Sequence, residues 1–566
     1  MKLTLLFLVV NLFSCGQSYV KSYSNLESAF IDWYFKFHPV ESTRYGSDKY
    51  NFSFPQLDSD ARAEYLADIQ RFHIELLQID ETKLPNTEFV NYNVLTQFLA
   101  HQVYFLQSVK RYEWDISLYP KVLYDGIVTL VDLDYLDMNA RTYALERRLE
   151  LSTTVLDEAY QNLKFYSKHH QQKAFEILDA LNLLLDELPI KIMSDNHTLD
   201  KIDTHIRKLK RELKIYKDWL IGDYSQFENH EIKKTPVELK NIFNHVVGEE
   251  YAISKISKLA DRRISKIQNQ LFDLSLPFYL QKNDEPVWVD IDDSLYVIYW
   301  VMDDIGKNKI NSQEYISSVY ASSKKINDEL KANKELYITE IPNIQIRFDD
   351  EYSISSTSTR VGRFQLNDDS NNVEYLLRPI DEEIKLMPIS NHFELDLRVI
   401  QDLSPGGLQF QQSIAENSQV LRKIIQNDVT QYGWQQHVVS YMIDSGLGGG
   451  ENYAYEITSL YNSLRITGLS WMELQIGYHE LDTLQIINEL MKRINIPKKD
   501  AKLFAENIYG EPFHFTKQFI GGIEMERLLL DYKRKNKNEV SMREFHSKIL
   551  NEGSIPISQL RKMILN

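Results

Sequence analysis

The sequence predicts a large, mainly α-helical protein with a small antiparallel β-sheet in its second half. Apolar residues recur at helical spacing over most of the 566 residues, whereas alternation of apolar and polar residues is confined to residues 337–380. Hydrophobic residues make up 43% of the chain and charged residues 26%, which is typical of a folded globular protein. A chain of this length can bury a substantial core.

The first residues resemble a bacterial lipoprotein export signal. Lys2 supplies a positive charge, and the apolar stretch at 3–13 is too short to span a bilayer. Cys15 ends the sequence LFSC, which is similar to a lipobox. We expect residues 1–14 to be a signal peptide, Cys15 to carry lipid and residues 15–24 to form a tether. The alternative is an ordinary secretory signal in which the cysteine is incidental.

These features predict an exported protein that is anchored by lipid in the bacterial cell envelope, at the outer membrane or facing the periplasm. Since Cys15 is the single cysteine of the chain, no internal disulfide can form. The formal net charge of -17 repels the phosphates of nucleic acid, and no basic run offsets it. We therefore expect the membrane, but not nucleic acid, to be a partner.

Helical periodicity dominates the amino-terminal half. The periodic stretches lie at 24–35, 60–79, 91–112, 139–188, 200–220, 236–274 and 292–334. We expect residues 25–336 to form a helical amino-terminal part.

The pattern changes at 337–380. Residues 344–348 and 364–366 alternate as strands do, and the polar run at 368–372 is typical of a turn. Helical spacing resumes at 412–427, 431–444, 454–492, 499–508 and 515–536. Because no low-complexity linker separates the two parts, we expect residues 337–566 to share one core with the preceding part.

Residues 401–409, QDLSPGGLQ, read like a zinc-hydrolase motif without its metal ligands. In the pattern H-E-x-x-P-G-H-x-L-Q, the two histidines hold zinc and the glutamate acts on bound water. Gln401 and Gly407 stand at the histidine positions and Asp402 at the glutamate position, while the proline and the glycine before Gly407 are kept.

Further segments resemble the bacterial domain-of-unknown-function 885 family. Residues 39–46 (PVESTRYG) are similar to its opening P-x-x-A-T-x-x-G, residues 144–163 to a family helix, and residues 543–557 to its closing F-H-D-x-x-L-x-x-G-x-x-P-L. The family is regarded as related to zinc metallopeptidases and is often lipidated. The resemblance therefore implies a large, helical, gluzincin-related body, with zinc in active members, and makes residues 337–566 a degenerate metallopeptidase-like part.

Other motifs of the family also lose their reactive residues here. In E-G-W-A-x-Y-x-E, Tyr432 replaces the first glutamate while Trp434 is kept. In R-x-x-R-L-x-x-D-x-G-x-H, Glu473 stands for the aspartate and Gly477 replaces the histidine. In P-G-Q-A-x-x-Y-x-x-G, Gln518 replaces the tyrosine. The resemblance thus implies a scaffold that persists without its ligands.

Zinc chemistry does not fit these positions. A catalytic zinc ion needs three nitrogen or carboxylate ligands and an open position for water. Gln401, Gly407 and Tyr432 offer an amide, a hydrogen atom and a phenol that is protonated at neutral pH. We predict that the protein has no metal and no cofactor. Without activated water, Asp402 is expected to cap a helix or to form a salt bridge.

A metal site formed by other residues is one alternative. The candidate ligands are His392, Glu394, His437, His479 and His514. No pair of them has the i,i+4 spacing of helical metal ligands, so buried, hydrogen-bonded histidines are the simpler interpretation. The glycine run at 446–450 lacks the lysine of a phosphate loop and is typical of a helix-to-helix loop.

Our leading hypothesis is a lipid-anchored envelope protein that has lost catalysis and binds a peptide or a partner protein in a residual cleft. The residues expected to line that cleft are Asp402, Tyr432, Trp434, His437, Glu473 and His514. One alternative is an active hydrolase with relocated or metal-independent catalytic groups. Another is a structural component of envelope assembly, which close packing around Trp434 and Leu408 would favour.

Overall fold

The structure of the protein, a computed structural model, is mainly α-helical, as the sequence predicts. It describes residues 2–132, 137–192, 196–228, 235–248, 250–283, 294–307, 309–311, 313–332, 343–348, 360–361, 372–377, 391–479, 481–494, 496, 498–507, 512–537 and 539–565. Across these ranges, no helix combines the length and the apolar character that a membrane span requires.

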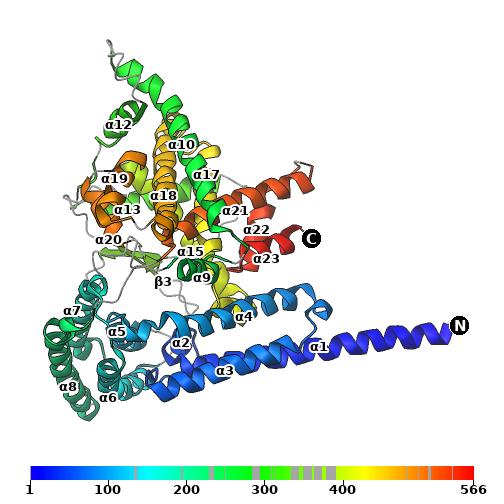
Figure 1. Ribbon diagram of the computed structural model, residues 1–566, viewed down its shortest axis with the longest axis vertical. Coiled ribbons are helices and arrows are strands. Elements are labelled where there is room, and N and C mark those ends of the chain that lie inside the picture. The colour runs from blue at the N-terminus through cyan, green and yellow to red at the C-terminus, as the bar shows by residue number, and fades with distance from the viewer. Residues whose placement is uncertain are drawn as a thin grey trace.

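The amino-terminal helices form the lower part of the molecule in Figure 1. They are α1 (Lys2–Phe37), α2 (Pro39–Arg44), α3 (Ser59–Leu77), α4 (Asn86–Tyr104), α5 (Leu118–Asp132), α6 (Met138–Asn162), α7 (Lys168–Lys191) and α8 (Asn196–Ile221). Helices α1, α3 and α4 pack against one another, and the amino-terminal end of α1 extends away from the body. Cys15 belongs to α1, and its side chain lies outside the described residues.

The remaining helices form the upper part of the molecule (Figure 1). The first four are α9 (Pro236–Val246), α10 (Ile253–Lys282), α12 (Ser294–Ile305) and α13 (Tyr315–Ala332). Those that follow the sheet are α14 (His392–Asp402), α15 (Gly407–Glu416), α16 (Val420–Ile424), α17 (Asp428–Asp444), α18 (Asn452–His479), α19 (Thr483–Ile494), α20 (Lys498–Asn507), α21 (His514–Lys535), α22 (Met542–Glu552) and α23 (Ile557–Leu565).

Local chemistry explains why one long predicted helix is divided in two. The stretch at 236–274 forms α9 and α10, which are separated at Gly248, where φ is +137° and a side chain would be strained. Helix α9 begins with a capping box in which Thr235 and Glu238 satisfy each other's backbone N–H groups. The helical period of the sequence therefore continues across a point at which the helix itself is interrupted.

Three short strands form a mixed sheet rather than the expected antiparallel one. Strands β1 (Asn343–Phe348), β2 (Arg360–Val361) and β3 (Asn372–Leu377) have the order β1-β3-β2. Strand β1 pairs in parallel with β3, with Asn343 opposite Asn372, and only β2 pairs antiparallel with β3. The connection from 349 to 371 is long enough for the crossover that parallel pairing requires. The strand and turn predicted at 364–366 and 368–371 lie outside the described residues.

A buried arginine connects the amino-terminal helices to the carboxy-terminal ones. Arg422 of α16 donates to Asn91 Oδ1 of α4 at 2.7 Å and forms an ion pair with Glu552 of α22, also at 2.7 Å. Val90 and Val94 of α4 belong to the same hydrophobic cluster as residues of α14, α15, α17 and α22. These contacts hold α4 in place against helices α14 to α17 and α22. The boundary between the two predicted parts at residue 336 remains a prediction.

Candidate functional site

Residues 401–407, which we call the motif turn, join the end of α14 to the start of α15. The indole N–H of Trp434 on α17 donates to the carbonyl oxygens of Pro405 and Gly406, at 2.9 and 3.2 Å. Trp434 and Leu408 are both fully buried. The motif turn is therefore packed onto α17, and Trp434 belongs to the core rather than to an accessible cleft, which corrects its predicted place among the cleft residues.

A side chain is excluded at each of the two glycines of the motif turn, by backbone at one position and by a neighbouring side chain at the other. A Cβ atom at Gly406 would lie 2.1 Å from the carbonyl oxygen of Gln401, so the backbone itself excludes a side chain. At Gly407 a Cβ atom would lie 2.7 Å from Gln435 Nε2, which is a side-chain atom of α17. The amide of Gln435 thus occupies the space in which a side chain at position 407 would begin.

Asp402 forms a salt bridge, one of its two predicted roles. Its carboxylate contacts the Arg398 guanidinium one turn earlier on α14 and accepts a hydrogen bond of 3.1 Å from the Tyr375 hydroxyl of β3. Asp402 is 5% exposed. Burial alone would lower the pKa of Arg398, but the Asp402 carboxylate raises it above its ordinary value. Arginine thus neutralises the carboxylate that would have to act on water.

Helices α17 and α21 cross at unusually close range because glycines meet there. A Cβ atom at Gly521 would lie 2.3 Å from the carbonyl oxygen of Val429, and one at Gly433 would lie 2.6 Å from that of Gly521. Only hydrogen atoms fit between the two backbones. The crossing brings neighbouring side chains of the two helices together: the Gln436 side-chain amide donates to the carbonyl oxygen of Gln518 at 2.6 Å.

This crossing gathers three of the residues singled out by sequence. The rings of Tyr432 and His514 meet edge to face with centroids 5.8 Å apart, and Gln518 Nε2 lies 2.9 Å from His514 Nε2. All three side chains are half-buried. We call Tyr432, His514 and Gln518 the tyrosine–histidine cluster.

Glu473 of α18 lies beside this cluster and caps α21. Its carboxylate accepts hydrogen bonds from the backbone N–H groups of Phe515 and Thr516, at 3.1 and 2.8 Å, and from the Thr516 hydroxyl at 2.7 Å. The N-cap residue Phe513 supplies no side-chain bond of its own. Burial raises the pKa of Glu473 to about 7, although Thr516 and His514 act in the opposite direction. Its contacts are those of a capping residue supplied by another helix.

His437 also belongs to the core. Its Nε2 atom lies 2.9 Å from Nε2 of His546 on α22, and both residues are buried. One imidazole must donate and the other accept, so the accepting ring is neutral in this geometry. Burial lowers the pKa of His437 to about 4, with a further lowering by Lys533. The burial of His437 does not favour its predicted place in a binding cleft, which stays a prediction.

The described residues do not fit a zinc ion. Gly407 provides no donor, Asp402 is neutralised by Arg398, and the ring of Tyr432 contacts that of His514 on α21. Within the described ranges, no group of three or more histidine, cysteine, aspartate or glutamate side chains could hold a metal. Glu394 lies in the first turn of α14, after the capping residue Asn391, and the side chain of His479 lies outside the described residues.

Sequence reasoning missed four residues that decide the site. Gln435, Arg398, Tyr375 and His546 all contact residues that the motifs had identified. Arg398 is one helical turn before Asp402, a spacing that could have predicted their ion pair. The other three contacts join distant segments, and no local pattern encodes them.

Comparisons with known proteins agree on the fold. A family model described as "Bacterial protein of unknown function (DUF885)" matches residues 39–564. A solved "putative lipoprotein of unknown function" from Shewanella oneidensis has a TM-score of 0.78 at 16% identity, over 96% of this chain and 100% of that one. A "putative lipoprotein" from Colwellia psychrerythraea has a TM-score of 0.74 at 13% identity, over 97% and 98%. No curated protein matches this chain.

The contact between positions 407 and 435 gives a first prediction. Gly407→Ala should lower the free energy of unfolding by about 1 to 2 kcal/mol, because its Cβ must displace the Gln435 amide. In a Gln435→Ala background the same change should cost less, with a coupling of about 1 kcal/mol. Denaturant unfolding of the four proteins measures this. Gly450→Ala, where a Cβ meets nothing within 4 Å, is the control. Strictly additive effects would contradict the contact.

The buried histidine pair gives a second prediction. His437 has a folded-state pKa of about 4 and an unfolded value near 6.5, so the unfolded chain binds its proton first as the pH falls. Its contribution to stability is complete above about pH 6.5 and is lost towards pH 4, by up to about 3 kcal/mol. We expect the free energy of unfolding of the wild type to fall more steeply across this window than that of His437→Gln. Equal pH slopes would show that His437 takes up its proton without cost in the folded protein.

Proposed function

The chain belongs to the DUF885 family of bacterial proteins of unknown function, and on that premise we propose that it is a lipid-anchored envelope protein which binds a peptide or partner protein without hydrolysing it. The single observation that carries the loss of catalysis is the contact at the motif turn. Gln435 fills the space beside Gly407, and Arg398 neutralises Asp402. Neither the ligands nor the base of a zinc hydrolase is free to act there.

The lipid anchor rests on the amino terminus. Cys15 follows a lysine and an apolar stretch, the amino-terminal end of α1 extends away from the body (Figure 1), and two proteins of the same fold are described as putative lipoproteins. Several acyl chains on one cysteine bind a membrane stably, whereas a single chain binds only weakly. Cell fractionation tests the anchor. We expect the wild type in the membrane fraction and Cys15→Ser in the soluble fraction, and a Cys15→Ser protein that stays membrane-bound would contradict it.

Peptide binding is supported by the tyrosine–histidine cluster. Tyr432, His514 and Gln518 are half-buried and offer two rings and an amide, on helices that a glycine crossing holds in place. Rings and amides suit the uncharged backbone of a peptide, since an amide both donates and accepts hydrogen bonds. This placement moves the expected site from the core residues Trp434 and His437 to the half-buried cluster that α17 and α21 form together.

Each alternative has one observation in its favour. A metal-independent hydrolase is favoured by Glu473, whose pKa of about 7 is that of a general acid or base and which lies beside His514. A structural role in envelope assembly is favoured by the complete burial of Trp434 and Leu408. Peptide binding is preferred to hydrolysis because every hydrogen bond that Glu473 accepts from a described residue comes from the start of α21.

One experiment separates the three functions. Purified full-length protein is incubated with a defined pool of unlabelled decapeptides, and mass spectrometry follows both cleavage and retention. We expect retention without cleavage, and about a tenfold weaker retention for Tyr432→Ala and His514→Ala, because each removes a contact ring. Tyr299→Ala, which removes an exposed ring of α12, is the matched control. Cleavage that is lost in Glu473→Gln would establish the hydrolase, and neither cleavage nor retention would favour the structural role.

A further inference from the structure

A pocket opens at the carboxy-terminal end of α17, away from the tyrosine–histidine cluster. Its volume is about 660 Å³, and it is lined by Glu329, Ala332, Tyr441, Met442, Ser445, Gly446 and Leu447. This volume lies within the range of about 300 to 1,000 Å³ that is usual for ligand sites. Tyr441 is nine residues after Tyr432 on one helix, so about 13 Å separates them along its axis.

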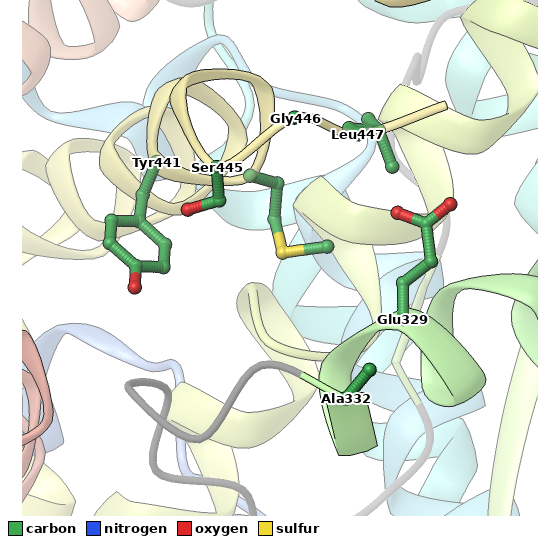
Figure 2. Close-up of a pocket in the computed structure, with 7 residues that line it drawn as sticks. Glu329, Ala332, Tyr441, Ser445, Gly446 and Leu447 are labelled. Carbon is green, nitrogen blue, oxygen red and sulfur yellow. The ribbon is translucent and has the colours of Figure 1, made fainter. Parts of the chain in front are cut away.

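The walls of the pocket combine one negative charge with an aromatic ring. Figure 2 shows the ring of Tyr441 on one side and the carboxylate of Glu329 on the other, with Ser445, Gly446 and Leu447 along the edge between them. Met442 and Leu447 are each 2% exposed and give the pocket an apolar floor. Among the lining residues that the structure describes, Glu329 is the single one with a formal charge.

No described cation neutralises Glu329. Lys325, one turn earlier on α13, is held elsewhere: its Nζ donates to Asp396 at 2.8 Å and to the Tyr455 hydroxyl at 2.5 Å. Among the described residues, Glu329 forms no ion pair. The negative charge of Glu329 therefore faces the pocket, in a protein whose net charge of -17 already attracts cations.

The surrounding structure holds both walls in place. The ring of Tyr441 packs edge to face on His546, with centroids 5.0 Å apart. Asn452 Nδ2 donates to the carbonyl oxygen of Leu447 at 3.0 Å. The backbone N–H of Leu447 donates to the carbonyl oxygen of Met442 at 3.1 Å. Gly446, with φ of +91°, allows the tight turn that points Leu447 inward. A preformed pocket loses little freedom when it binds.

We propose that this pocket binds an organic cation carried on an alkyl stem, such as the side chain of lysine or arginine. The carboxylate of Glu329 would pair with the charge, and the ring of Tyr441 would contact it through its face. Met442 and Leu447 would pack against the methylene groups of the stem. The inference goes beyond the proposed function, since it concerns another site and stands on the pocket alone.

Three small probes test the chemistry, each titrated calorimetrically into the full-length protein at 0.15 M salt. They are acetyl-Gly-Lys-Gly-amide, the same tripeptide with norleucine in place of lysine, and 1,5-diaminopentane. We expect saturable binding of the cations and about tenfold weaker binding of the norleucine peptide, because it lacks the charge that pairs with Glu329. Preference for the lysine peptide assigns the pocket to protein side chains, and preference for the diamine assigns it to free amines.

Variants locate the binding. Glu329→Gln keeps the shape of the pocket and should weaken the preferred cation about tenfold or more, while Tyr441→Leu should weaken it about threefold to tenfold. Asp328→Asn, the same change of charge on the exposed neighbour of Glu329, should have no effect. The proposal is overturned if no cation binds, if norleucine binds as well as lysine, or if Asp328→Asn weakens binding as much as Glu329→Gln. A peptide without basic residues is not expected to bind in this pocket. Its retention therefore tests the tyrosine–histidine cluster alone, and the cation titrations test this pocket alone.

Discussion

The close contact between α17 and α21 is the constraint on which the site depends. Gly433 and Gly521 let the two backbones approach to a distance at which no side chain fits. This contact fixes the rotation of α17, and the rotation decides what each of its side chains meets. Trp434 faces the motif turn, Gln435 faces Gly407, and Tyr432 faces His514. One helix thus organises the core, the filled motif turn and the half-buried cluster.

Two contacts of the motif turn bear on metal binding. A metal site needs both donors and room, and here neither is present: an amide occupies the room beside Gly407, and a guanidinium neutralises Asp402. A buried carboxylate without a partner is costly, so a chain that lost its metal while keeping the acid would need a replacement cation. Arg398 is such a cation, and Tyr375 satisfies a further lone pair. The pairing explains how the Asp402 carboxylate can stay buried at 5% exposure.

Periodicity predicted most helices because amphipathic faces repeat wherever one side meets solvent. It failed for α5, whose residues 126–130 are all buried and therefore show no polar face. It also joined α9 to α10, because the period continues across Gly248. The absence of histidine from positions 401 and 407 of the resembling zinc motif could be read from residue types at fixed spacing. The roles of Gln435 and His546 could not be predicted from the sequence, because each depends on a contact between segments that only the folded chain brings together.

The most direct test of the account is a crystal of the full-length protein soaked in zinc and measured at the zinc absorption edge. A filled and neutralised motif turn predicts no anomalous peak within bonding distance of Asp402, about 2 Å for a zinc–oxygen bond, and an Arg398 side chain still paired with the carboxylate. An ordered peak on Asp402 with Arg398 displaced would contradict the central claim, because it would show that this site still holds a metal.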